Sequence, residues 1–487
     1  MPQSPYDNLL AGVRTELYIG GAWRPAADGA RLDVTDPATE ATITSVASAC
    51  VEDAMAAVDA AAAAGPAWAA KKPRERGEIL RKAHEIMLRE GERLARLMTL
   101  ENGKSLSDSR AEVAYAAEFF RWNAEEAVRN IGQVSVAPSS GARIVVQHKP
   151  SGVAVLVTPW NFPAAMATRK IGPALAAGCT VVLKPASETP LTALALVPIL
   201  EEAGVPAGVV NVIPSRRSGA VVGGMLKDLR VRVISFTGST EVGQKLIHAA
   251  AENVVKPVME LGGNAPFIVF DDADLDAAVE GALIAKMRNM GEACTSANRF
   301  YVHEAVHDAF VEKFAARMKG LKLGNGLEDG VAVGPLVNAE TRDKVAELVD
   351  DAVAKGAKLV TGGKAVAGAG YFFPATVLTG VPDDARLLRE EIFGPVAPIQ
   401  TFRDEDEIVA KANATEYGLV AYLFTRDLSR GLRVSERLEF GMVGLNRGLV
   451  SDPAAPFGGV KQSGLGREGG HEGLMDFLET QYVSVTW

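Results

Sequence analysis

From about Ser151 onward, short runs of apolar, mostly β-branched residues alternate with segments of helical character. The runs are VAVLVT (Val153–Thr158), TVVLK (Thr180–Lys184), VRVISF (Val231–Phe236) and APFIVF (Ala265–Phe270), and a second series starts at AKLVTGG (Ala357–Gly363). Helices are expected after the first four runs, beginning near Ala164, Pro190, Glu241 and Asp274. Apolar strands that alternate with helices indicate βαβ units on a parallel sheet buried on both faces. The sequence therefore predicts an α/β fold.

Two long helices are expected upstream of this region. The first is the alanine-rich stretch Ala54–Gly65, because alanine is the strongest helix former, and Pro66 is expected to end it. The second begins at Pro73 and runs to about Leu100, with apolar residues at helical spacing.

The composition is typical of a globular protein, with 487 residues, 48% hydrophobic and 23% charged, and a net charge of −9. An acidic chain argues against a nucleic-acid or anionic-membrane binder, and no segment has the pattern of a membrane span or a signal peptide. The three cysteines are far apart, which argues against disulfides and a zinc site. Cys50 and Cys179 lie among small apolar residues and are expected in the core. We expect no metal and a cytoplasmic location.

Two glycine motifs compete as a nucleotide phosphate site. A G-x-G-x-x-G pattern occurs at Gly464, Gly466 and Gly469. It follows no strand and no βαβ unit follows it, so a flexible loop is the better interpretation. SFTGSTEVG (Ser235–Gly243) instead joins an apolar strand to a helix. Gly238 permits close backbone approach there, and Ser239 is a residue type that begins helices, whose free N–H groups bind phosphate. An ordinary strand-to-helix turn is the alternative.

One cysteine and one glutamate are candidates for nucleophilic and acid–base chemistry. Cys294 lies in the polar, small-residue stretch NMGEACTSANR, whereas cysteines in apolar runs are usually inert core residues. Glu260 lies in PVMELGGNAPF, between apolar residues and two glycines, which predicts partial desolvation. Desolvation raises a carboxyl pKa toward the range of a general base. Taken alone, each residue has a plain alternative: a buried inert thiol and a solvated loop carboxylate.

Several segments, in the same order along the chain, resemble the aldehyde dehydrogenase superfamily. They are TPWNFP (Thr158–Pro163), KPASETP (Lys184–Pro190), FTGSTEVG (Phe236–Gly243), MELGGN (Met259–Asn264), GEACTSANR (Gly291–Arg299) and EIFGP (Glu391–Pro395). The resemblance implies a Rossmann-like nucleotide domain, an α/β catalytic domain and a small β unit for oligomerisation. We expect the nucleotide domain from 1–127 and 151–262, the catalytic domain from 263–470, and the oligomerisation strands from 128–150 and 471–487. A homodimer or homotetramer is expected.

The resemblance also implies catalytic roles. Cys294 matches the thiolate nucleophile, Glu260 the general base, and Asn161 the amide that forms an oxyanion hole with the Cys294 N–H. In the implied reaction the thiolate attacks an aldehyde, the thiohemiacetal passes hydride to the nicotinamide, and Glu260 activates water to hydrolyse the thioester. A CoA-acylating enzyme, which generally lacks a base at the Glu260 position, and a non-enzymatic homologue are the alternatives.

The cofactor site is implied in the same way. The residues expected to bind the cofactor are Trp160, Lys184, Ser187, Gly238, Ser239, Glu391 and Phe393. Relatives that prefer NAD often have Glu at the Ser187 position, where its carboxylate repels a 2′-phosphate. A neutral Ser187 near Lys184 therefore predicts a preference for NADP, with NAD as the alternative. Lys170 and Glu468 resemble members of a proton relay.

Within the superfamily the chain most resembles the succinic semialdehyde dehydrogenases, whose substrate carries a carboxylate far from the aldehyde. Arg169, Arg288 and Ser451 match that group's carboxylate ligands, and guanidinium and hydroxyl donors suit a carboxylate. Arg447 and Asp452 depart from the group, so glutarate semialdehyde or another ω-acid aldehyde is an alternative substrate.

Two departures lie beside the nucleophile. Glu292 stands where many members have Gln. Ser296 stands where some members have a second cysteine that forms a redox disulfide, and we expect that switch to be absent.

Overall fold

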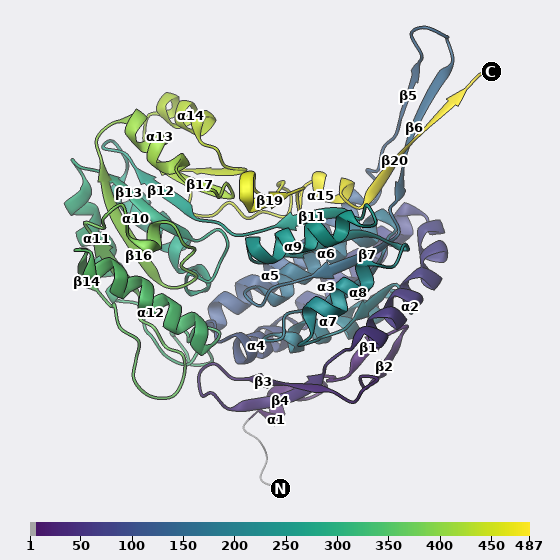
Figure 1. The fold of residues 1–487 in the computed structure, drawn as a ribbon, viewed down its shortest axis with the longest axis horizontal. Helices are drawn as coiled ribbons and strands as arrows, with labels where there is room; N and C mark the ends of the chain where they lie inside the picture. The colour runs from purple at the N-terminus through teal and green to yellow at the C-terminus, as the bar shows by residue number, and fades with distance from the viewer. Residues whose placement is uncertain (1–5) are drawn as a thin grey trace.

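The computed structural model, which describes residues 6–487, contains two large sheets on opposite sides of the molecule (Figure 1). The first has eight strands in the order β19-β11-β10-β7-β8-β9-β1-β2, and its strands from β11 to β9 are parallel. Its strands are β1 (Leu17–Ile19), β2 (Ala22–Arg24), β7 (Val153–Val157), β8 (Thr180–Lys184), β9 (Val210–Val212), β10 (Val231–Thr237), β11 (Lys256–Glu260) and β19 (Gly464–Leu465). The α/β fold predicted from the alternating runs is confirmed.

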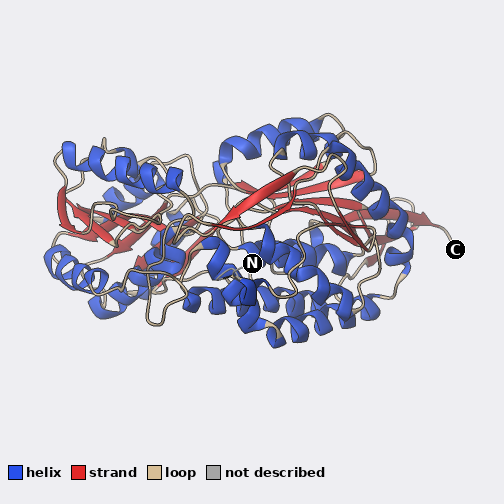
Figure 2. Cartoon of the chain, turned by 90° about the horizontal axis from the view of Figure 1, so that it is seen from below, coloured by secondary structure: helices blue, strands red, loops and turns tan. Residues whose placement is uncertain are grey.

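Helices cover both faces of this sheet because its strands carry apolar side chains on both sides (Figure 2). In β7, Val153, Val155 and Val157 belong to one core and Ala154 and Leu156 to the other, as the two-residue repeat of a strand requires. One face packs against α2 (Val51–Ala70), α8 (Ser218–Leu226) and α9 (Thr240–Ala251). The other is covered by α3 (Pro73–Arg89), α4 (Gly91–Asn102), α5 (Leu106–Glu126), α6 (Pro163–Ala177) and α7 (Pro190–Ala203).

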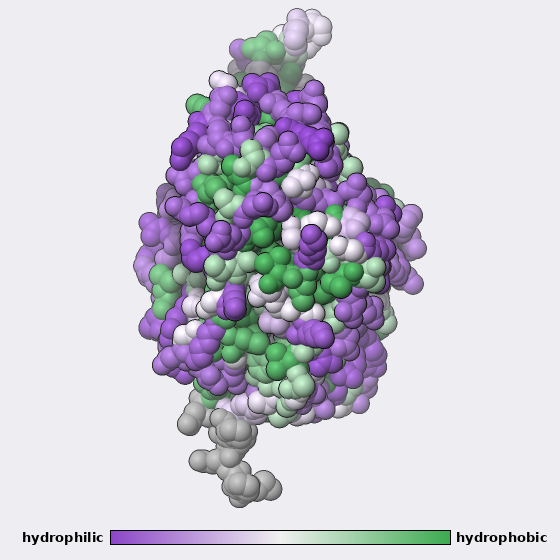
Figure 3. All heavy atoms as spheres, turned by 90° about the vertical axis from the view of Figure 1, so that its left-hand side faces the viewer, coloured by the Kyte–Doolittle hydropathy of each residue, from purple (hydrophilic) through white to green (hydrophobic). Residues whose placement is uncertain are grey.

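The second sheet has seven strands in the order β14-β15-β16-β13-β12-β17-β18, with only β14 antiparallel to its neighbour. The strands are β12 (Ala265–Val269), β13 (Ala297–His303), β14 (Lys358–Thr361), β15 (Thr376–Thr379), β16 (Val396–Phe402), β17 (Val420–Phe424) and β18 (Met442–Leu445). Its helices are α10 (Leu275–Met287), α11 (His307–Lys319), α12 (Ala339–Ala354), α13 (Glu405–Asn413) and α14 (Leu428–Arg437). The outer end of this half is mostly hydrophilic, with separate hydrophobic patches (Figure 3).

A three-stranded sheet, which we call the arm, projects from the body and ends beside the C-terminus (Figure 1). It consists of β5 (Gln133–Val136), β6 (Arg143–Pro150) and β20 (Leu478–Val485). Within the arm, β6 is the central strand and pairs with β20 of the same chain. The remaining elements are β3 (Arg31–Thr35), β4 (Thr42–Ala47), α1 (Asp7–Leu10), α15 (Glu472–Met475) and the 3-10 turns η1 (Arg288–Gly291), η2 (Arg386–Leu388) and η3 (Lys461–Ser463).

Two of the expected helix boundaries are wrong. Helix α2 continues through Pro66 to Ala70, and its last turn buries Trp68, which is 1% exposed. A proline inside a helix costs about 3 kcal/mol, and burial of a large apolar side chain contributes a stabilisation of similar size. The helix expected from Pro73 to about Leu100 is two helices, because the backbone of Glu90 leaves the helical region (φ −84°, ψ 5°) before Gly91 starts α4.

Of the two cysteines expected in the core, only Cys179 is there. Cys179 is in the core, as predicted, and its thiol donates to the Phe477 carbonyl oxygen. Cys50 is only half-buried because it is the N-cap of α2, where its thiol donates to an Asp53 carboxylate oxygen at 3.3 Å.

Candidate functional site

The order of the first sheet creates a crevice at the ends of β7 and β10. The chain leaves β7 toward β8 on one side, and β10 lies on the other, with Phe236 paired to Val157. Open α/β sheets bind ligands at such a reversal, beyond the carboxyl ends of the strands. The loop that carries Trp160 and Asn161 therefore meets the turn formed by Gly238 and Ser239.

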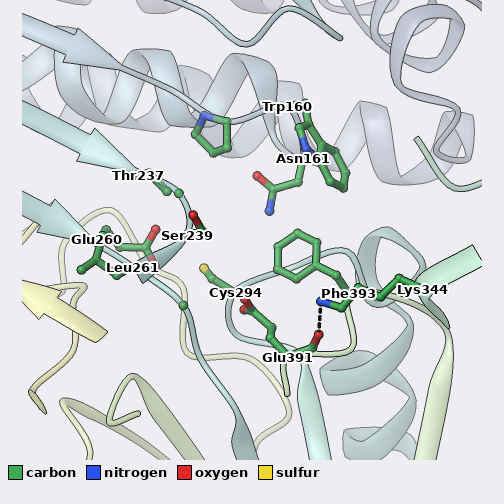
Figure 4. Close-up of a pocket in the computed structure, with 13 residues that line it drawn as sticks. Trp160, Asn161, Thr237, Ser239, Glu260, Leu261, Cys294, Lys344, Glu391 and Phe393 are labelled. Atoms are coloured by element: carbon green, nitrogen blue, oxygen red, sulfur yellow. Dashed lines mark hydrogen bonds between the residues drawn. The ribbon is translucent and has the colours of Figure 1, made fainter. Parts of the chain in front are cut away.

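The two large sheets face each other across this crevice. Glu260 is the last residue of β11, and Cys294 lies just before the first residue of β13. A side chain at Gly263 would place its Cβ 2.4 Å from the Cys294 carbonyl oxygen, so only glycine permits this approach. Cys294 and Glu260 line one cavity, and the Asn161 amide points toward Cys294 from the opposite wall (Figure 4).

The thiol and the carboxylate are both strongly desolvated. Cys294 is 9% exposed, and burial, together with the nearby Glu260 charge, raises the pKa of its thiol well above the ordinary value. Burial also raises the pKa of Glu260, against the opposing charge of Arg169, whose Nη2 lies 3.6 Å from Oε2. Neither Glu260 oxygen has a hydrogen-bond partner within residues 6–487. A buried carboxylate that accepts no hydrogen bond and lies beside a protonated thiol is suited to accept a proton from it or from water.

The loop before Cys294 is held by two asparagine side chains. Asn161 Nδ2 donates to the Glu292 carbonyl oxygen at 3.1 Å, and Asn289 Nδ2 donates to the same oxygen at 2.9 Å. Asn289 and Met290 have φ of 51° and 57°, a region that most residues avoid and that is often found at functional sites. One N–H of the Asn161 amide is thus used to fix the loop, and the second is available to a ligand oxygen.

Glu292, the departure from Gln, is buried below the nucleophile. Its Oε1 accepts from the Val337 N–H at 3.0 Å, and Oε2 has no partner in the described part of the chain. Burial raises the pKa of Glu292 to about 8. The side chain is therefore mainly uncharged at neutral pH and resembles the neutral amide it replaces.

A second cavity continues from the first and shares Pro159, Thr237 and Gly238 with it. It is lined by Lys184, Ser187 and Glu188 at its far end. A Cβ at Gly238 would lie 2.4 Å from the Phe236 ring, and Ser239 is the N-cap of α9, accepting from the Val242 N–H at 3.4 Å. A bare turn before a helix N-terminus fits a pyrophosphate, so the residues present fit a nicotinamide dinucleotide.

The far end of this cavity carries opposing charges. Burial lowers the pKa of Lys184 to about 8, against the attraction of Glu188, and its ammonium has no hydrogen-bond partner among the described residues. Ser187 Oγ donates to Glu188 Oε2 at 3.1 Å. The sequence analysis named Ser187 as a cofactor residue and did not name Glu188, the next residue in the chain.

The near end is lined by two aromatic rings and an acid. Trp160 and Phe393 lie edge to face, with ring centroids 5.7 Å apart, and Phe393 has a φ of 53°. Glu391 Oε1 accepts from the Gly263 N–H at 3.1 Å, and burial raises the pKa of Glu391 to about 7. Lys344, not singled out from the sequence, lines the same cavity and donates to the Glu391 carbonyl oxygen at 2.8 Å (Figure 4).

Arg288 and Ser451 lie together outside the lining of these two cavities. Arg288 Nη1 donates to Ser451 Oγ at 3.1 Å, and its Cζ lies 4.8 Å from the Phe162 ring and 5.4 Å from the Tyr115 ring. No carboxylate in residues 6–487 lies within ion-pair distance of this guanidinium. Arg447 and Asp452 are exposed, and Asp452 Oδ1 caps its own turn by accepting from the Ala454 N–H. Among the described residues, neither departure forms a hydrogen bond or an ion pair with Arg288.

Arg169 is committed to an internal network. Its Nε forms an ion pair with Glu468, which also pairs with Lys170, and Lys170 Nζ donates to Ser235 Oγ at 3.0 Å. The Arg169 Cζ lies 4.4 Å from the Phe457 ring, and Phe457 packs against Cys294. Arg169 thus links Glu260 to Glu468 and is not a free guanidinium like that of Arg288.

The chain was compared with known proteins. A family model described as aldehyde dehydrogenase family matches residues 23–483. The chain belongs to the aldehyde dehydrogenase family. It is 56% identical over 443 residues to a succinate-semialdehyde dehydrogenase of Paenarthrobacter nicotinovorans, covering 91% of this chain and 98% of the relative. It is 50% identical over 473 residues to a glutarate-semialdehyde dehydrogenase of Pseudomonas putida, covering 97% and 98%. A crystal structure described as an E. coli NADP dependent enzyme has a TM-score of 0.97 and 49% identity, and covers 100% of both chains.

In this aldehyde dehydrogenase, the family and the fold predicted from the sequence are confirmed. Across residues 6–487, no helix has the length and apolar character needed to cross a membrane. In the same described range, no group of three or more His, Cys, Asp or Glu side chains is arranged to hold a metal ion.

Proposed function

We propose that this aldehyde dehydrogenase oxidises succinic semialdehyde to succinate. The observation that carries the proposal is the Arg288–Ser451 pair, which has a guanidinium without a carboxylate partner among the described residues and lies between aromatic rings. Phe162, whose ring lies beside Arg288, follows Asn161 in the sequence. Phe457 contacts both Arg169 and Cys294. An aldehyde at Cys294 with a carboxylate at its far end fits this arrangement.

The residues of the chain divide the chemistry among them. Glu260 accepts the thiol proton of Cys294, directly or through water, and the thiolate attacks the aldehyde carbon. The second N–H of the Asn161 amide and the Cys294 backbone N–H stabilise the oxyanion that forms. When bound, a nicotinamide dinucleotide supplies the acceptor for the hydride. After Glu260 has released the thiol proton, it takes a proton from the water that hydrolyses the Cys294 thioester, and Lys170 and Glu468 lie beyond Arg169 as a route by which both protons leave in turn.

Arg288→Ala is expected to lower kcat/KM for succinic semialdehyde by about 10- to 150-fold and to leave that for butanal nearly unchanged. A hydrogen bond to a charged group contributes about 1.5–3 kcal/mol, and butanal has no carboxylate to lose it. Steady-state kinetics on both aldehydes measure the difference. The matched control is Arg426→Ala, which removes an exposed arginine paired with Asp274 and should change neither value. Equal losses on the two aldehydes would contradict the carboxylate assignment.

Arg169→Ala is a poorer test of the same site. Its removal leaves Glu468 with one cation fewer and takes away the positive charge beside Glu260 and Cys294. We therefore expect it to depress the oxidation of charged and uncharged aldehydes alike.

We further propose that NADP is the preferred cofactor, because Lys184 has an ammonium without a partner among the described residues and Ser187 is neutral. Ser187→Glu is expected to shift the NADP/NAD ratio of kcat/KM by about 10- to 100-fold toward NAD, since a carboxylate would face the 2′-phosphate. Glu188→Gln is the matched control of opposite sign, because it removes the acid now bound to Ser187. A ratio unchanged in Ser187→Glu would mean that the 2′-phosphate lies elsewhere.

We propose that the arm, as part of an oligomerisation unit formed by 128–150 and 471–487, joins copies of the chain. Its exposed side chains include Val134, Tyr482 and Trp487, which are 70%, 60% and 78% exposed. A projecting sheet with apolar side chains and free edges is a surface that pairs with another chain. Light scattering is expected to give two or four times the chain mass of 51.3 kDa. A monomer at micromolar concentration would contradict this proposal.

A further inference from the structure

Tyr115, on α5, is a partly buried tyrosine that no part of the proposed mechanism uses. Its hydroxyl oxygen is buried and has no hydrogen-bond partner in residues 6–487. Its ring lies 5.4 Å from the Arg288 Cζ on one side and packs edge to face against Phe119, with centroids 4.9 Å apart. A buried hydroxyl without a partner costs about 1–3 kcal/mol, which favours a role with a ligand.

The surroundings of this hydroxyl are cationic and polar. The charges of Arg169 and Arg288 both act on the phenol, and Arg169 and Ser451 lie beside its oxygen without forming a hydrogen bond of good geometry. Burial nevertheless raises the pKa of Tyr115 above its ordinary value, so the hydroxyl keeps its proton at neutral pH and is a donor. Arg169 and Arg288 can only donate, and Ser451 Oγ already accepts from Arg288, so no carboxylate or carbonyl oxygen pairs with the Tyr115 hydroxyl among the described residues.

Arg169 is already paired with internal carboxylates, so it is a less available donor for a ligand than the Tyr115 hydroxyl. Its Nε is paired with Glu468, and its Nη2 lies 3.0 Å from Met166 Sδ and 3.6 Å from Glu260. A carboxylate that bound Arg169 directly would compete with two internal carboxylates. Tyr115 stands between Arg169 and the Arg288–Ser451 pair and can supply a hydrogen bond without disturbing that network.

We propose that the Tyr115 hydroxyl donates a hydrogen bond to the far carboxylate of the substrate, alongside Arg288 and Ser451. This inference rests on the proposed function, because it requires a substrate with such a carboxylate. It makes Tyr115 a specificity-determining residue. Arg169 then acts on the carboxylate through its charge and remains the partner of Glu260 and Glu468.

Tyr115→Phe tests the hydroxyl alone, since it keeps the ring that packs on Arg288. We expect KM for succinic semialdehyde to rise about 10-fold or more with little change in kcat, because the contact is equal in the ground and transition states. The inhibition constant of succinate should rise by the same factor, and the kinetics of butanal should not change. Tyr18→Phe is the matched control, because it removes a remote tyrosine hydroxyl that donates to Glu201 at 2.7 Å.

The possible results separate this inference from the proposed function. A wild-type enzyme with equal kcat/KM for butanal and for succinic semialdehyde would overturn the proposed function. A wild-type enzyme that discriminates, with an unchanged KM and succinate inhibition constant in Tyr115→Phe, would overturn only the role of Tyr115. Equal losses on both aldehydes in Tyr115→Phe would also overturn it, because the phenol would then act on the catalytic groups and not on the carboxylate.

Discussion

Cys294→Ala is expected to lower aldehyde turnover by about 10⁴–10⁶-fold, the size of effect seen when an enzyme loses its nucleophile. The dissociation constant of NADP, measured by fluorescence titration, should stay within about 2-fold, since the thiol forms one wall of the cavity and the contacts that we propose for the cofactor lie on Lys184, Gly238 and Ser239. The matched control is Cys50→Ala, which removes a half-buried thiol at the start of α2 and should retain full turnover. A Cys294→Ala enzyme with more than about 1% of wild-type turnover would remove Cys294 from the mechanism.

Glu260→Gln is expected to slow the burst of reduced cofactor, because the amide cannot accept the thiol proton, and to slow the steady state that follows still more, by about 10²–10⁴-fold. The amide cannot activate water, so the thioester on Cys294 accumulates after the hydride has left. Stopped-flow absorbance measures both phases. The matched control is Glu241→Gln, an exposed acid on α9 paired with Lys245, which should change neither phase. A burst slowed as much as the steady state would mean that Glu260 acts mainly on the thiol.

The same variant tests the pH dependence. Only the carboxylate form of Glu260 is a base, and burial raises its pKa, so the wild-type steady-state rate should rise with pH through a range above that of an ordinary glutamate. Glu260→Gln should lack this rise.

Much of the fold was predictable because local sequence and tertiary structure agree. The runs at Thr180–Lys184 and Ala265–Phe270 are continuously apolar, and both became central strands covered on two faces. The helix end predicted at Pro66 is wrong because the burial of Trp68, a tertiary effect, keeps the last turn of α2 helical. The prediction that Cys50 lies in the core is wrong because its small apolar neighbours do not reveal that it is the N-cap of α2.

The site was predictable where motifs carry it and hidden where distant segments meet. Cys294, Glu260 and Asn161 each lie in a recognisable motif, and the structure brings them into one cavity. Tyr115 lies in no such motif, because an aromatic residue on an amphipathic helix is usually predicted to be a core residue. The pairing of Arg169 with Glu468 was equally invisible, since it depends on how the segment near β19 returns to the first sheet.

That return has a consequence for the order in which the chain is made. Helix α6 and strand β11 leave the ribosome long before residues 464–468, yet β19 completes the edge beside β11, and Glu468 neutralises both Arg169 and Lys170. Until that segment arrives, Arg169 has only Glu260 as an ion-pair partner and Lys170 has none among the described residues, and a buried unpaired charge is costly. We therefore expect the edge of the first sheet beside Glu260 to reach its final packing only once residues 464–468 have been made.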